Sequence, residues 1–557
     1  MADIAVEGAE TPARRAPLRT VVAASAAGTA FEWYDFFVFG SLTQVISKTF
    51  FSGLNDTAGY IAALALFGAG FAFRPIGALV FGRIGDRAGR KGAFLITVTL
   101  MGGATVAIGL LPTYAQVGLL APALLVLMRI LQGFALGGEY GGAAIYVAEH
   151  APPGARGRST SWVQTSAAFG LFGALLVILA TRLAVGAAFG PEAFDAWGWR
   201  IPFLVSAGLL GISIWMRLKL TESPSFARMK AAGEQSHAPY AEAFGRWSNL
   251  KIVLLALVAI MSAQGAVWYT AFFYTQTFME KFLKVAPETI NALMMAATAV
   301  SAVGYVVFGW LSDKAGRKPV MLFGMTLMLI AYFPGFHLLA QTLNPALAEA
   351  QARTPVVVVA DPADCSLQFD PVGKASFVSS CDIAKSVLAN AGVSYVNRPA
   401  PAGSPAKVMI GEAAVASADA RGLDKAAVKK VRGEVEARLK AGLAAAGYPA
   451  KADPARMNLP GAFGVLIVFV IAATALFGPI AACLVELFPT RIRYTAMSLP
   501  YHIGTGWIGG FVPFTAFAIV AATGNIYSGL WYPLAFTLLS VLTCLLLLPE
   551  TRNRPLD

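Results

Sequence analysis

The chain has 557 residues, of which 57% are hydrophobic and 13% are charged, and its formal net charge is +12 at pH 7. A charged fraction about half that of ordinary globular proteins excludes a water-soluble protein of this length. The chain has no Walker A motif, because Gly373-Lys374 is followed by Ala375, and its four histidines form no metal-ligand cluster, so we expect neither an ATP-driven protein nor an enzyme, and neither a metal nor a cofactor.

Apolar segments that are long enough to cross a ~30 Å hydrocarbon core at 1.5 Å per residue recur along most of the chain. Residues 1–19 precede the first segment and are polar, and no small-residue cleavage signature follows, so we expect no removable signal peptide. Twelve such segments predict twelve transmembrane helices. They lie within 20–47, 57–82, 93–111, 118–147, 160–186, 199–218, 250–280, 289–311, 319–340, 460–485, 494–521 and 527–548.

Basic residues gather in the short loops that follow the even-numbered segments. This is the positive-inside pattern of membrane proteins, and it accounts for the net charge without a nucleic-acid partner. We therefore expect the tails 1–19 and 549–557 and the basic linker 219–249 to be cytoplasmic. The loops after the second and eighth segments, for example, contain Arg83, Arg87, Arg90 and Lys91, and Lys314, Arg317 and Lys318.

The loop after the second segment is repeated after the eighth. Residues 82–91 read Gly-x-x-x-Asp-Arg-x-Gly-Arg-Lys, and residues 309–318 read Gly-x-x-x-Asp-Lys-x-Gly-Arg-Lys, at an offset of 227. Glu149 after the fourth segment and Glu486 after the tenth form another related pair, but at an offset of 337. The chain is therefore predicted to contain one six-helix half, 20–218, and a second half, 250–340 with 460–548, that holds about 110 extra residues.

The extra residues, 341–459, lie between the ninth and tenth segments and are polar and rich in proline and charge. Residues 354–360 and 407–410 are predicted as strands and 423–446 as a helix, which indicates a small α/β domain. This loop has an odd number, so we expect the domain outside the cytoplasm. Its role stays open between a spacer or lid and a domain that captures solute or binds a partner.

The two repeated loops resemble the signature of the major facilitator superfamily. Within it, residues 28–37, 74–77 and 129–140 resemble the metabolite:proton symporter family, which includes carriers of oxoglutarate, citrate, shikimate and proline or betaine. The resemblance implies the all-α major facilitator fold and alternating access. It also implies proton-coupled uptake of a small organic solute across the inner membrane of a Gram-negative bacterium, with 341–459 in the periplasm. It does not extend to 341–459.

Charged residues of the repeated loops are predicted to close the cytoplasmic end of the transporter. The resemblance makes Asp86 and Asp313 gate residues, and their basic neighbours hold the same face. The other charges after the fourth and tenth segments complete ion pairs between the halves, or they are solvated residues that only fix the topology. The eight candidate gate residues are Asp86, Arg90, Asp313, Arg317, Glu149, Arg158, Glu486 and Arg493.

Charged residues inside the apolar segments are few, and each costs about 2.5–3.5 kcal/mol to insert, so they usually mark a pathway. Asp35 and Arg129 both lie about 16–18 Å below the outer ends of their helices, counted at 1.5 Å per residue. We therefore predict that they pair near the midplane and that protonation of Asp35 releases Arg129 for the solute. A permanent structural ion pair is the alternative, and Glu32, three residues before Asp35, is the alternative proton carrier.

The solute site is predicted between the halves. Arg74 is a second cation that suits a carboxylate, or it stabilises a kink beside Pro75. Gln132, Glu139 and Tyr140 share one stripe of the fourth helix with Arg129. The other cavity candidates are polar and aromatic residues of the fifth, seventh and eleventh helices, for which simple packing is the alternative. They are Gln164, Gln264, Trp268, Tyr269, Tyr274, His502 and Trp507.

Three functions agree with these features. The preferred one is a proton symporter for a small organic acid. The others are a symporter for a zwitterionic osmolyte such as proline or betaine, and a nutrient sensor that transports little. In each case we expect a monomer in the lipid bilayer whose ligands are a small solute and protons.

The four cysteines fall into two groups. Cys483 and Cys544 lie inside the tenth and twelfth segments and are expected to be free and buried. Cys365 and Cys381 lie sixteen positions apart in the insertion. In the oxidising periplasm that the resemblance implies, we predict a disulfide between them, against the alternative of two unrelated thiols.

Overall fold

The structure, a computed structural model, describes residues 17–52, 70–190, 192–219, 221–366 and 377–556. Ten helices of this part of the chain are long and apolar enough to cross a membrane. Two more, α1 (Leu18–Ser41) and α4 (Arg74–Arg87), lie where the first and second segments are expected, although 57–69 of the second segment lie outside the described residues. The predicted helical membrane architecture with an α/β insertion is confirmed.

The N-terminal half is built from α1, α4 and the helices up to residue 218, and two short helices of the linker follow it. The remaining elements are α2 (Thr43–Phe50), α5 (Arg90–Leu110), α6 (Tyr114–Val117), α7 (Leu120–His150), η1 (Pro153–Ala155), α8 (Arg156–Phe189), η2 (Phe194–Gly198), α9 (Arg200–Leu218), α10 (Pro224–Ala231) and α11 (Pro239–Phe244).

The C-terminal half starts with a long span in which α-helix alternates with π turns, and its eleventh helix contains another π turn. The elements of the first span are α12 (Trp247–Ala256), η3 (Leu257–Met261), α13 (Ser262–Tyr269), η4 (Thr270–Tyr274), α14 (Thr275–Thr277) and η5 (Phe278–Phe282). The later ones are α15 (Pro287–Ala315), α16 (Arg317–Leu343), α20 (Leu459–Phe477), α21 (Ile480–Leu487), α22 (Arg493–His502), η8 (Ile503–Gly509), α23 (Val512–Thr523), η9 (Ser528–Leu530) and α24 (Trp531–Leu547).

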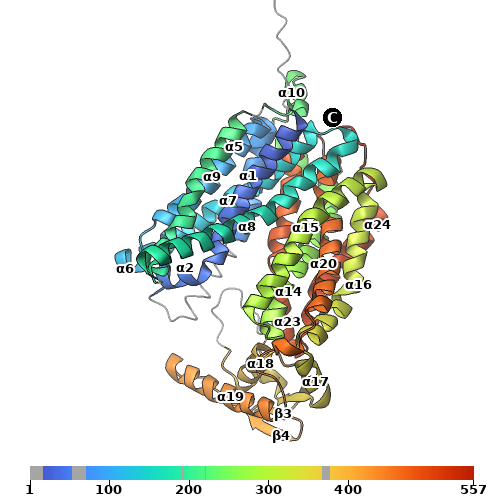
Figure 1. Ribbon diagram of the computed structural model, residues 1–557. Helices are drawn as coiled ribbons and strands as arrows, with labels where there is room; N and C mark the ends of the chain where they lie inside the picture. The colour runs from blue at the N-terminus through green and yellow to red at the C-terminus, as the bar shows by residue number, and fades with distance from the viewer. Residues whose placement is uncertain (1–16, 53–69, 191, 220, 367–376, 557) are drawn as a thin grey trace, which may run out of the picture.

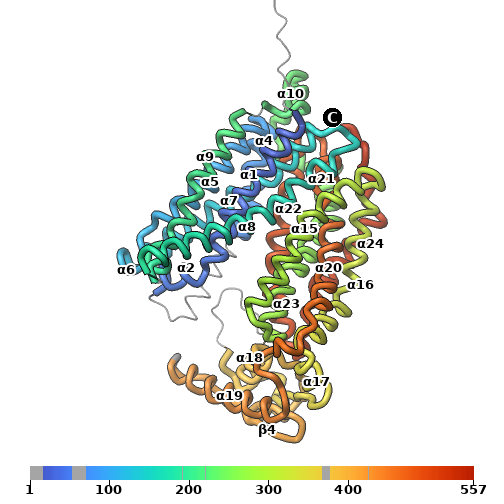
Figure 2. Tube along the Cα trace, viewed as in Figure 1, coloured from blue at the N-terminus to red at the C-terminus, as the bar shows by residue number. Residues whose placement is uncertain are grey.

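The two halves lie side by side, and across their interface α8 packs against α15 and α4 against α22 (Figures 1 and 2). We call the end formed by loops 88–89, 151–155 and 488–492 the basic end. The opposite end, where the inserted domain lies, is the insertion end. In Figure 1 the halves meet at the basic end and diverge toward the insertion end.

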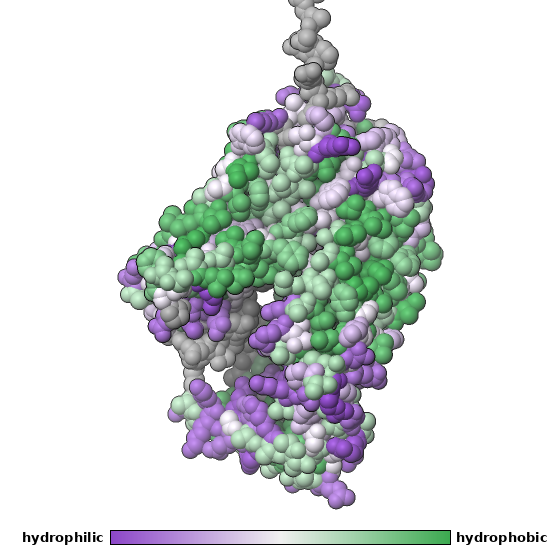
Figure 3. Space-filling model, viewed as in Figure 1, coloured by the Kyte–Doolittle hydropathy of each residue, from purple (hydrophilic) through white to green (hydrophobic). Residues whose placement is uncertain are grey.

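The outer faces of the helices expose large apolar side chains. Leu176, Leu179 and Leu183 form such a face on α8 at helical spacing, and α24 exposes leucines in the same way. These side chains form the hydrophobic band that Figure 3 shows between two hydrophilic ends. A band of this kind faces the lipid, since a helix satisfies its own backbone hydrogen bonds in the bilayer.

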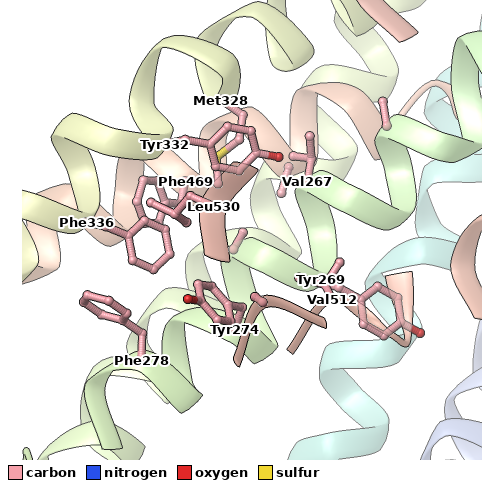
Figure 4. Close-up of a cluster of buried hydrophobic side chains, with 14 of the residues drawn as sticks. Val267, Tyr269, Tyr274, Phe278, Met328, Tyr332, Phe336, Phe469, Val512 and Leu530 are labelled. Atoms are coloured by element: carbon pink, nitrogen blue, oxygen red, sulfur yellow. The ribbon is translucent and has the colours of Figure 1, made fainter. Parts of the chain in front are cut away.

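Inside the C-terminal half, aromatic and aliphatic side chains fill the space between the helices. Phe278 from η5, Phe336 from α16 and Phe469 from α20 pack together, with a centroid separation of 4.9 Å between Phe278 and Phe336 (Figure 4). Tyr332 and Tyr274 lie in the same core. This dense core holds the helices of the C-terminal half together, including those that contact the other half.

The inserted domain contains a four-stranded sheet with two longer helices. Its strands have the order β2-β1-β3-β4, with β1 parallel to β2 and the other pairs antiparallel. Both predicted strands and the predicted helix are present, whereas β2, β4 and α18 were not predicted. The elements are α17 (Pro345–Arg353), β1 (Val356–Ala360), η6 (Pro362–Asp364), α18 (Ser380–Asn390), β2 (Tyr395–Pro399), β3 (Lys407–Ile410), β4 (Ala413–Ala416), α19 (Lys425–Ala445) and η7 (Pro454–Arg456).

The cysteines are arranged as predicted. Cys365, after η6, forms a disulfide with Cys381 in α18, with Cα atoms 5.2 Å apart. Cys483 in α21 and Cys544 in α24 are free and buried. The disulfide therefore ties the end of the first strand region to the helix that packs on the sheet.

The inserted domain is hydrogen-bonded to two loops of the C-terminal half. The Tyr395 amide donates to the Gly524 carbonyl at 2.6 Å, and the Ala452 amide donates to the Lys284 carbonyl at 3.1 Å. Where the domain is inserted, the amide of Asn458, the N-cap of α20, donates to the Thr342 carbonyl in the last turn of α16 at 2.8 Å. Among the described residues, no hydrogen bond or ion pair joins the domain to the N-terminal half.

Candidate transport site and gate

At the basic end, Asp86 reaches from the end of α4 to the first turn of α22 in the other half. Its Oδ1 accepts the amide of Tyr494 at 3.1 Å and its Oδ2 accepts that of Thr495 at 2.8 Å. Arg90 donates to the same Oδ1 at 2.7 Å. Because the first amides of a helix have no partner within the helix, a carboxylate there caps it. Asp86 therefore ties the two halves together.

Asp313, at the end of α15, makes the equivalent contact in the opposite direction. It accepts the amides of Gly157 at 2.9 Å and Arg158 at 2.7 Å, which belong to the first turn of α8. Arg317 donates to Asp313 Oδ1 at 2.6 Å. The repeat in the sequence is thus also a repeat of the contact, and each half caps a helix of the other.

The glycines of the first repeated loop allow this close approach. A Cβ atom at Gly85 would lie 2.0 Å from the ring of Tyr494, and one at Gly82 would lie 2.8 Å from the Thr495 Cα. Any larger residue would therefore separate α4 from α22 and break the cap that Asp86 provides.

Two buried glutamates form further ion pairs between the halves at the basic end. Glu149 Oε1 lies 2.6 Å from Arg493 Nη1 and 4.0 Å from Arg90 Nη2. Glu486 Oε1 lies 3.1 Å from Arg317 Nη2 and 3.5 Å from Arg156 Nη1. Each glutamate is thus held by the arginine of its own half's repeated loop and by one arginine of the other half.

One predicted gate residue is replaced by a neighbour. The side chain of Arg158 is exposed and only its backbone amide contacts the other half, whereas Arg156 forms the ion pair with Glu486. Two positions along a helix rotate a side chain by about 200°, which carries Arg158 away from the interface. The offset of 337 relates Arg493 to Arg156, so the repeat itself contained the signal for the correct residue.

Near the midplane, Asp35 and Arg129 do not form the predicted ion pair. Asp35 Oδ1 accepts the Ser206 hydroxyl of α9 at 2.5 Å, and Arg129 Nη1 donates to Gln132 Oε1 at 2.8 Å. The depth of each residue was predicted from helix length, but the rotation of α1 turns Asp35 toward α9.

A polar chain still connects the two charged groups. Gln132 Nε2 donates to the Thr105 hydroxyl at 2.8 Å, and Thr105 is also a polar neighbour of Asp35. The guanidinium carbon of Arg129 lies 4.1 Å from the ring centroid of Phe39. Asp35 and Arg129 are therefore coupled through α5 and α7 side chains rather than by direct contact.

Glu32 lies in a separate buried cluster. Its Oε1 and Oε1 of Glu139 are each 2.8 Å from Nη2 of Arg217, at the end of α9. Thr97 donates to Glu139 Oε2 at 2.8 Å, and the guanidinium carbon of Arg217 lies 3.6 Å from the ring centroid of Phe94. Glu139 was predicted to line the solute site, but it pairs with Arg217 inside the N-terminal half.

Arg74 lies between the halves. It is buried, it faces Tyr269 and Tyr501 of the C-terminal half, and its guanidinium carbon lies 4.2 Å from the ring centroid of Phe71. Its Nε and Nη2 have no hydrogen-bond partner among the described residues. Pro75 lies in the first turn of α4, where a helix tolerates proline.

Aromatic rings from both halves surround this region. Tyr140 and Tyr501 stack with centroids 3.7 Å apart, and Gln164 Nε2 donates to the Tyr140 hydroxyl at 2.6 Å. Trp268 Nε1 donates to the Tyr305 hydroxyl at 2.7 Å. We call the following set the aromatic layer: Tyr140, Trp268, Tyr305, Phe477 and Tyr501.

Two further predicted residues are buried with unused polar atoms. Within the described part of the chain, Gln264 Oε1 and both ring nitrogens of His502 have no hydrogen-bond partner. They lie next to the π turns η3 and η8, and π turns often occur at functional sites. Trp507, in contrast, is 47% exposed, and Tyr274 belongs to the C-terminal core.

Sequence reasoning missed several residues of the site. Arg217 reads as one more basic residue at the end of a helix, and only its burial distinguishes it. Ser206 and Thr105 are polar residues in apolar helices, which is a weak signal. Tyr501, from the interrupted eleventh helix, could have been found from the same aromatic argument that selected Tyr269.

In the part of the chain that the structure describes, a helical bundle of two related halves that cap each other at one end, with buried polar groups between them, defines a membrane transport protein of the major facilitator type. The chain matches the sugar (and other) transporter family over residues 20–242 and 441–557, and it belongs to that family. It also matches the MFS/sugar transport protein family over residues 144–360. These are families of transporters rather than enzymes, which agrees with the expectation from the sequence motifs.

Several curated proteins are similar to the chain. It is 35% identical over 330 residues to the glycine betaine/proline/ectoine/pipecolic acid transporter OusA of Dickeya dadantii (strain 3937), covering 58% of this chain and 65% of OusA. It is 36% identical over 331 residues to the shikimate transporter of Escherichia coli (strain K12), covering 58% of this chain and 72% of that protein. It is 34% identical over 315 residues to the citrate-proton symporter of Klebsiella pneumoniae, covering 56% of this chain and 68% of that protein.

The chain thus spans just under two thirds of the length of OusA. Among solved structures, the proton:xylose symporter XylE bound to 6-bromo-6-deoxy-D-glucose has the same fold, with a TM-score of 0.62 at 15% identity and 97% of each chain covered. At this identity the likeness establishes the major facilitator fold and nothing about the solute.

Proposed function

We propose that the protein is a proton-coupled symporter that imports a small organic acid by alternating access. The observation that carries this proposal is Arg74, a buried guanidinium between the halves with two nitrogens that lack a partner among the described residues. A planar cation with free donors suits a carboxylate. The shikimate transporter and the citrate-proton symporter, whose names specify organic acids, are similar over most of their lengths.

The orientation follows from the positive-inside pattern. The basic end and both tails face the cytoplasm of the inner membrane, and the inserted domain lies in the periplasm. In the described conformation the capped helices close the basic end, while Figure 3 shows the surface hollowed between the halves above the inserted domain. Solute therefore enters from the periplasmic side in this state, and release requires both caps to open.

Proton coupling is assigned to Asp35 with Arg129. Protonation of Asp35 removes its charge and weakens its hold on Ser206, and this change reaches Arg129 through Thr105 and Gln132. Binding of proton and solute then favour one another, since each biases the same polar chain. The cytoplasmic gate opens once both sites are filled.

A second candidate solute is a zwitterionic osmolyte. The aromatic layer lies beside Arg74, and ring faces attract a quaternary or secondary ammonium group, so the two together suit a carboxylate and a cation on one small molecule. OusA, whose name specifies such solutes, is among the similar proteins.

Purified protein in proteoliposomes tests these proposals. Uptake of labelled shikimate, citrate and glycine betaine is measured with and without an inward proton gradient. Accumulation of an acid only with the gradient supports the proposal, and accumulation of betaine alone supports the second candidate. Binding without uptake of any of the three contradicts symport and indicates a sensor.

A further inference from the structure

The cluster of Glu32, Glu139 and Arg217 contains two carboxyl groups and one cation in the interior of the N-terminal half. Both carboxyl oxygens contact the same nitrogen, Nη2 of Arg217, at 2.8 Å. The side chains of all three residues are at most 4% exposed. With both carboxyl groups ionised, the cluster would hold a net negative charge without contact with water.

The surroundings offer little compensation for that charge. Thr97 of α5 donates to Glu139, and the Tyr494 hydroxyl of α22 donates to the carbonyl of Gly138 rather than to a carboxyl group. Asp35 is the next acid on α1. The remaining charged groups near Tyr494 are Asp86 and Arg90, which pair with each other.

One oxygen of the cluster is unused. Among the described residues, Glu32 Oε2 is buried and has no hydrogen-bond partner, and neither have Nε and Nη1 of Arg217. Because the two Oε1 atoms lie 2.8 Å from the same nitrogen of Arg217, the carboxyl groups of Glu32 and Glu139 are immediate neighbours. Two ionised carboxylates repel each other at this distance, whereas a carboxyl group and a carboxylate can share a proton in a hydrogen bond.

We propose that Glu32 and Glu139 together bind one proton, held between them opposite Arg217. The bound proton makes the cluster electrically neutral and gives the two carboxyl groups a hydrogen bond. Arg217 acts as a positioning residue, because it sets the charge that the pair must balance. The site binds a proton and no solute, so Glu139 is removed from the predicted solute site.

The position of the cluster suggests its use. Glu32 precedes Asp35 by three residues, so the two lie on the same face of α1, with Glu32 one turn nearer to the basic end. Once the pair has released its own proton toward the cytoplasm, it can accept a proton that Asp35 releases. This role rests on the proposed proton coupling, whereas the shared proton itself can be measured without transport.

Infrared spectroscopy of the purified protein in nanodiscs at neutral pH tests the proposal, because only a protonated carboxyl group shows the free-acid carbonyl stretch. We expect Glu32→Gln and Glu139→Gln each to lose one such band that Asp35→Asn retains. Each single variant leaves one carboxylate opposite Arg217 and is neutral without a proton. Retention of the full wild-type band in both single variants overturns the proposal, whatever the uptake measurements show.

Thermal unfolding provides a second test, which depends on the net charge of Glu32, Glu139 and Arg217. Glu32→Gln/Glu139→Gln leaves Arg217 unpaired in the interior, so its unfolding temperature should lie below that of either single variant. The single variants should also lose less stability than the wild type as the pH rises from 7 to 10, because they have no proton to release. A double variant as stable as both singles contradicts a charge-balanced cluster.

Discussion

Arg156, in the first turn of α8, lies 3.5 Å from Glu486 of the opposite half and also donates to the carbonyl of Arg554 at 2.6 Å. The nearby Arg158 has an exposed side chain. These two arginines, two positions apart, form a matched pair for testing the gate.

We predict that Arg156→Gln weakens closure of the basic end. Loss of charge-assisted hydrogen bonds costs about 2 kcal/mol, which lowers the ratio of closed to open molecules about thirtyfold. Double electron–electron resonance between spin labels at the exposed positions Arg87 and Lys314 should show a longer label-to-label distance in Arg156→Gln than in the wild type. Arg158→Gln is the control and should give the wild-type distance. Equal effects of both variants would remove the side chain of Arg156 from the gate.

Asp35→Asn should abolish accumulation of solute against its gradient but leave solute exchange intact, because only the titrating step is removed. Ser206→Ala keeps the carboxyl group and removes only its hydrogen bond, so it should retain accumulation. Both variants can be compared in proteoliposomes with an inward proton gradient. Accumulation by Asp35→Asn at the wild-type level would exclude Asp35 as the coupling residue.

Arg74→Gln should raise the apparent Kd for a carboxylate solute more than tenfold, or by about 1.4 kcal/mol, and change little for a neutral analogue. The reason is that the amide cannot form the paired charged hydrogen bonds of a guanidinium. Isothermal titration of purified protein with the acid and with its amide checks this. A similar loss for both compounds would assign Arg74 to structure.

Lys284 lies in the loop that follows η5. Burial, together with the positive charges of Lys281 and Lys440, lowers its pKa to about 8. Its pKa in the unfolded chain is about 10.4, so between these values the unfolded chain binds more protons and folded-state stability rises with pH. The unfolding temperature of the wild type, relative to that of Lys284→Gln, should therefore rise from about pH 8 to about pH 10. A difference that does not change with pH would contradict the burial of a titrating amine.

The Cys365–Cys381 disulfide should stabilise the inserted domain by about 3 kcal/mol, the value expected for closing a loop of this size. Cys365→Ser/Cys381→Ser should accordingly speed hydrogen exchange in β1 and α18. Reduction of the wild type should reproduce this change, and the double variant should not respond to reduction. Linked peptides in unreduced protein are the direct check, and alkylation of both cysteines without reduction would exclude the bridge.

The fold could be predicted because it depends on two features that are easy to recognise in the sequence, long apolar segments and repeated loops. Twelve apolar segments fix the number of helices, and the offsets between repeated loops locate the insertion without reference to composition. The π turns of the seventh and eleventh helices left no comparable signal. Gly265, between two π turns of the seventh helix, packs closely against Gly504 in the π turn of the eleventh, with a Cβ at Gly265 only 2.1 Å from the Gly504 carbonyl oxygen.

The candidate site was predicted less completely, and the reason differs between residues. Counting along the helices placed Asp35 and Arg129 at the same depth, but a count of rise does not give the rotation that turns Asp35 toward Ser206. Arg217 occurs where basic residues usually fix topology, so its role depends on tertiary burial alone. Asp86 and Asp313 were selected because the repeated loops resemble a family signature, and the structure adds that each carboxylate accepts backbone amides of the other half.

The hydrogen bonds of the inserted domain have a mechanical consequence. They join the loop at Lys284, which follows η5, to the loop at Gly524, which follows α23. The Asn458–Thr342 bond joins α20 to α16, so the ends of several helices of the C-terminal half are linked to one another. We therefore expect the C-terminal half to move as a rigid body. The opening between the halves at this end should then change by rotation of one whole half relative to the other. A probe on α19 would follow the C-terminal half, and because α19 lies far from the basic end, where the halves meet (Figure 1), a small rotation would displace the probe by a larger distance.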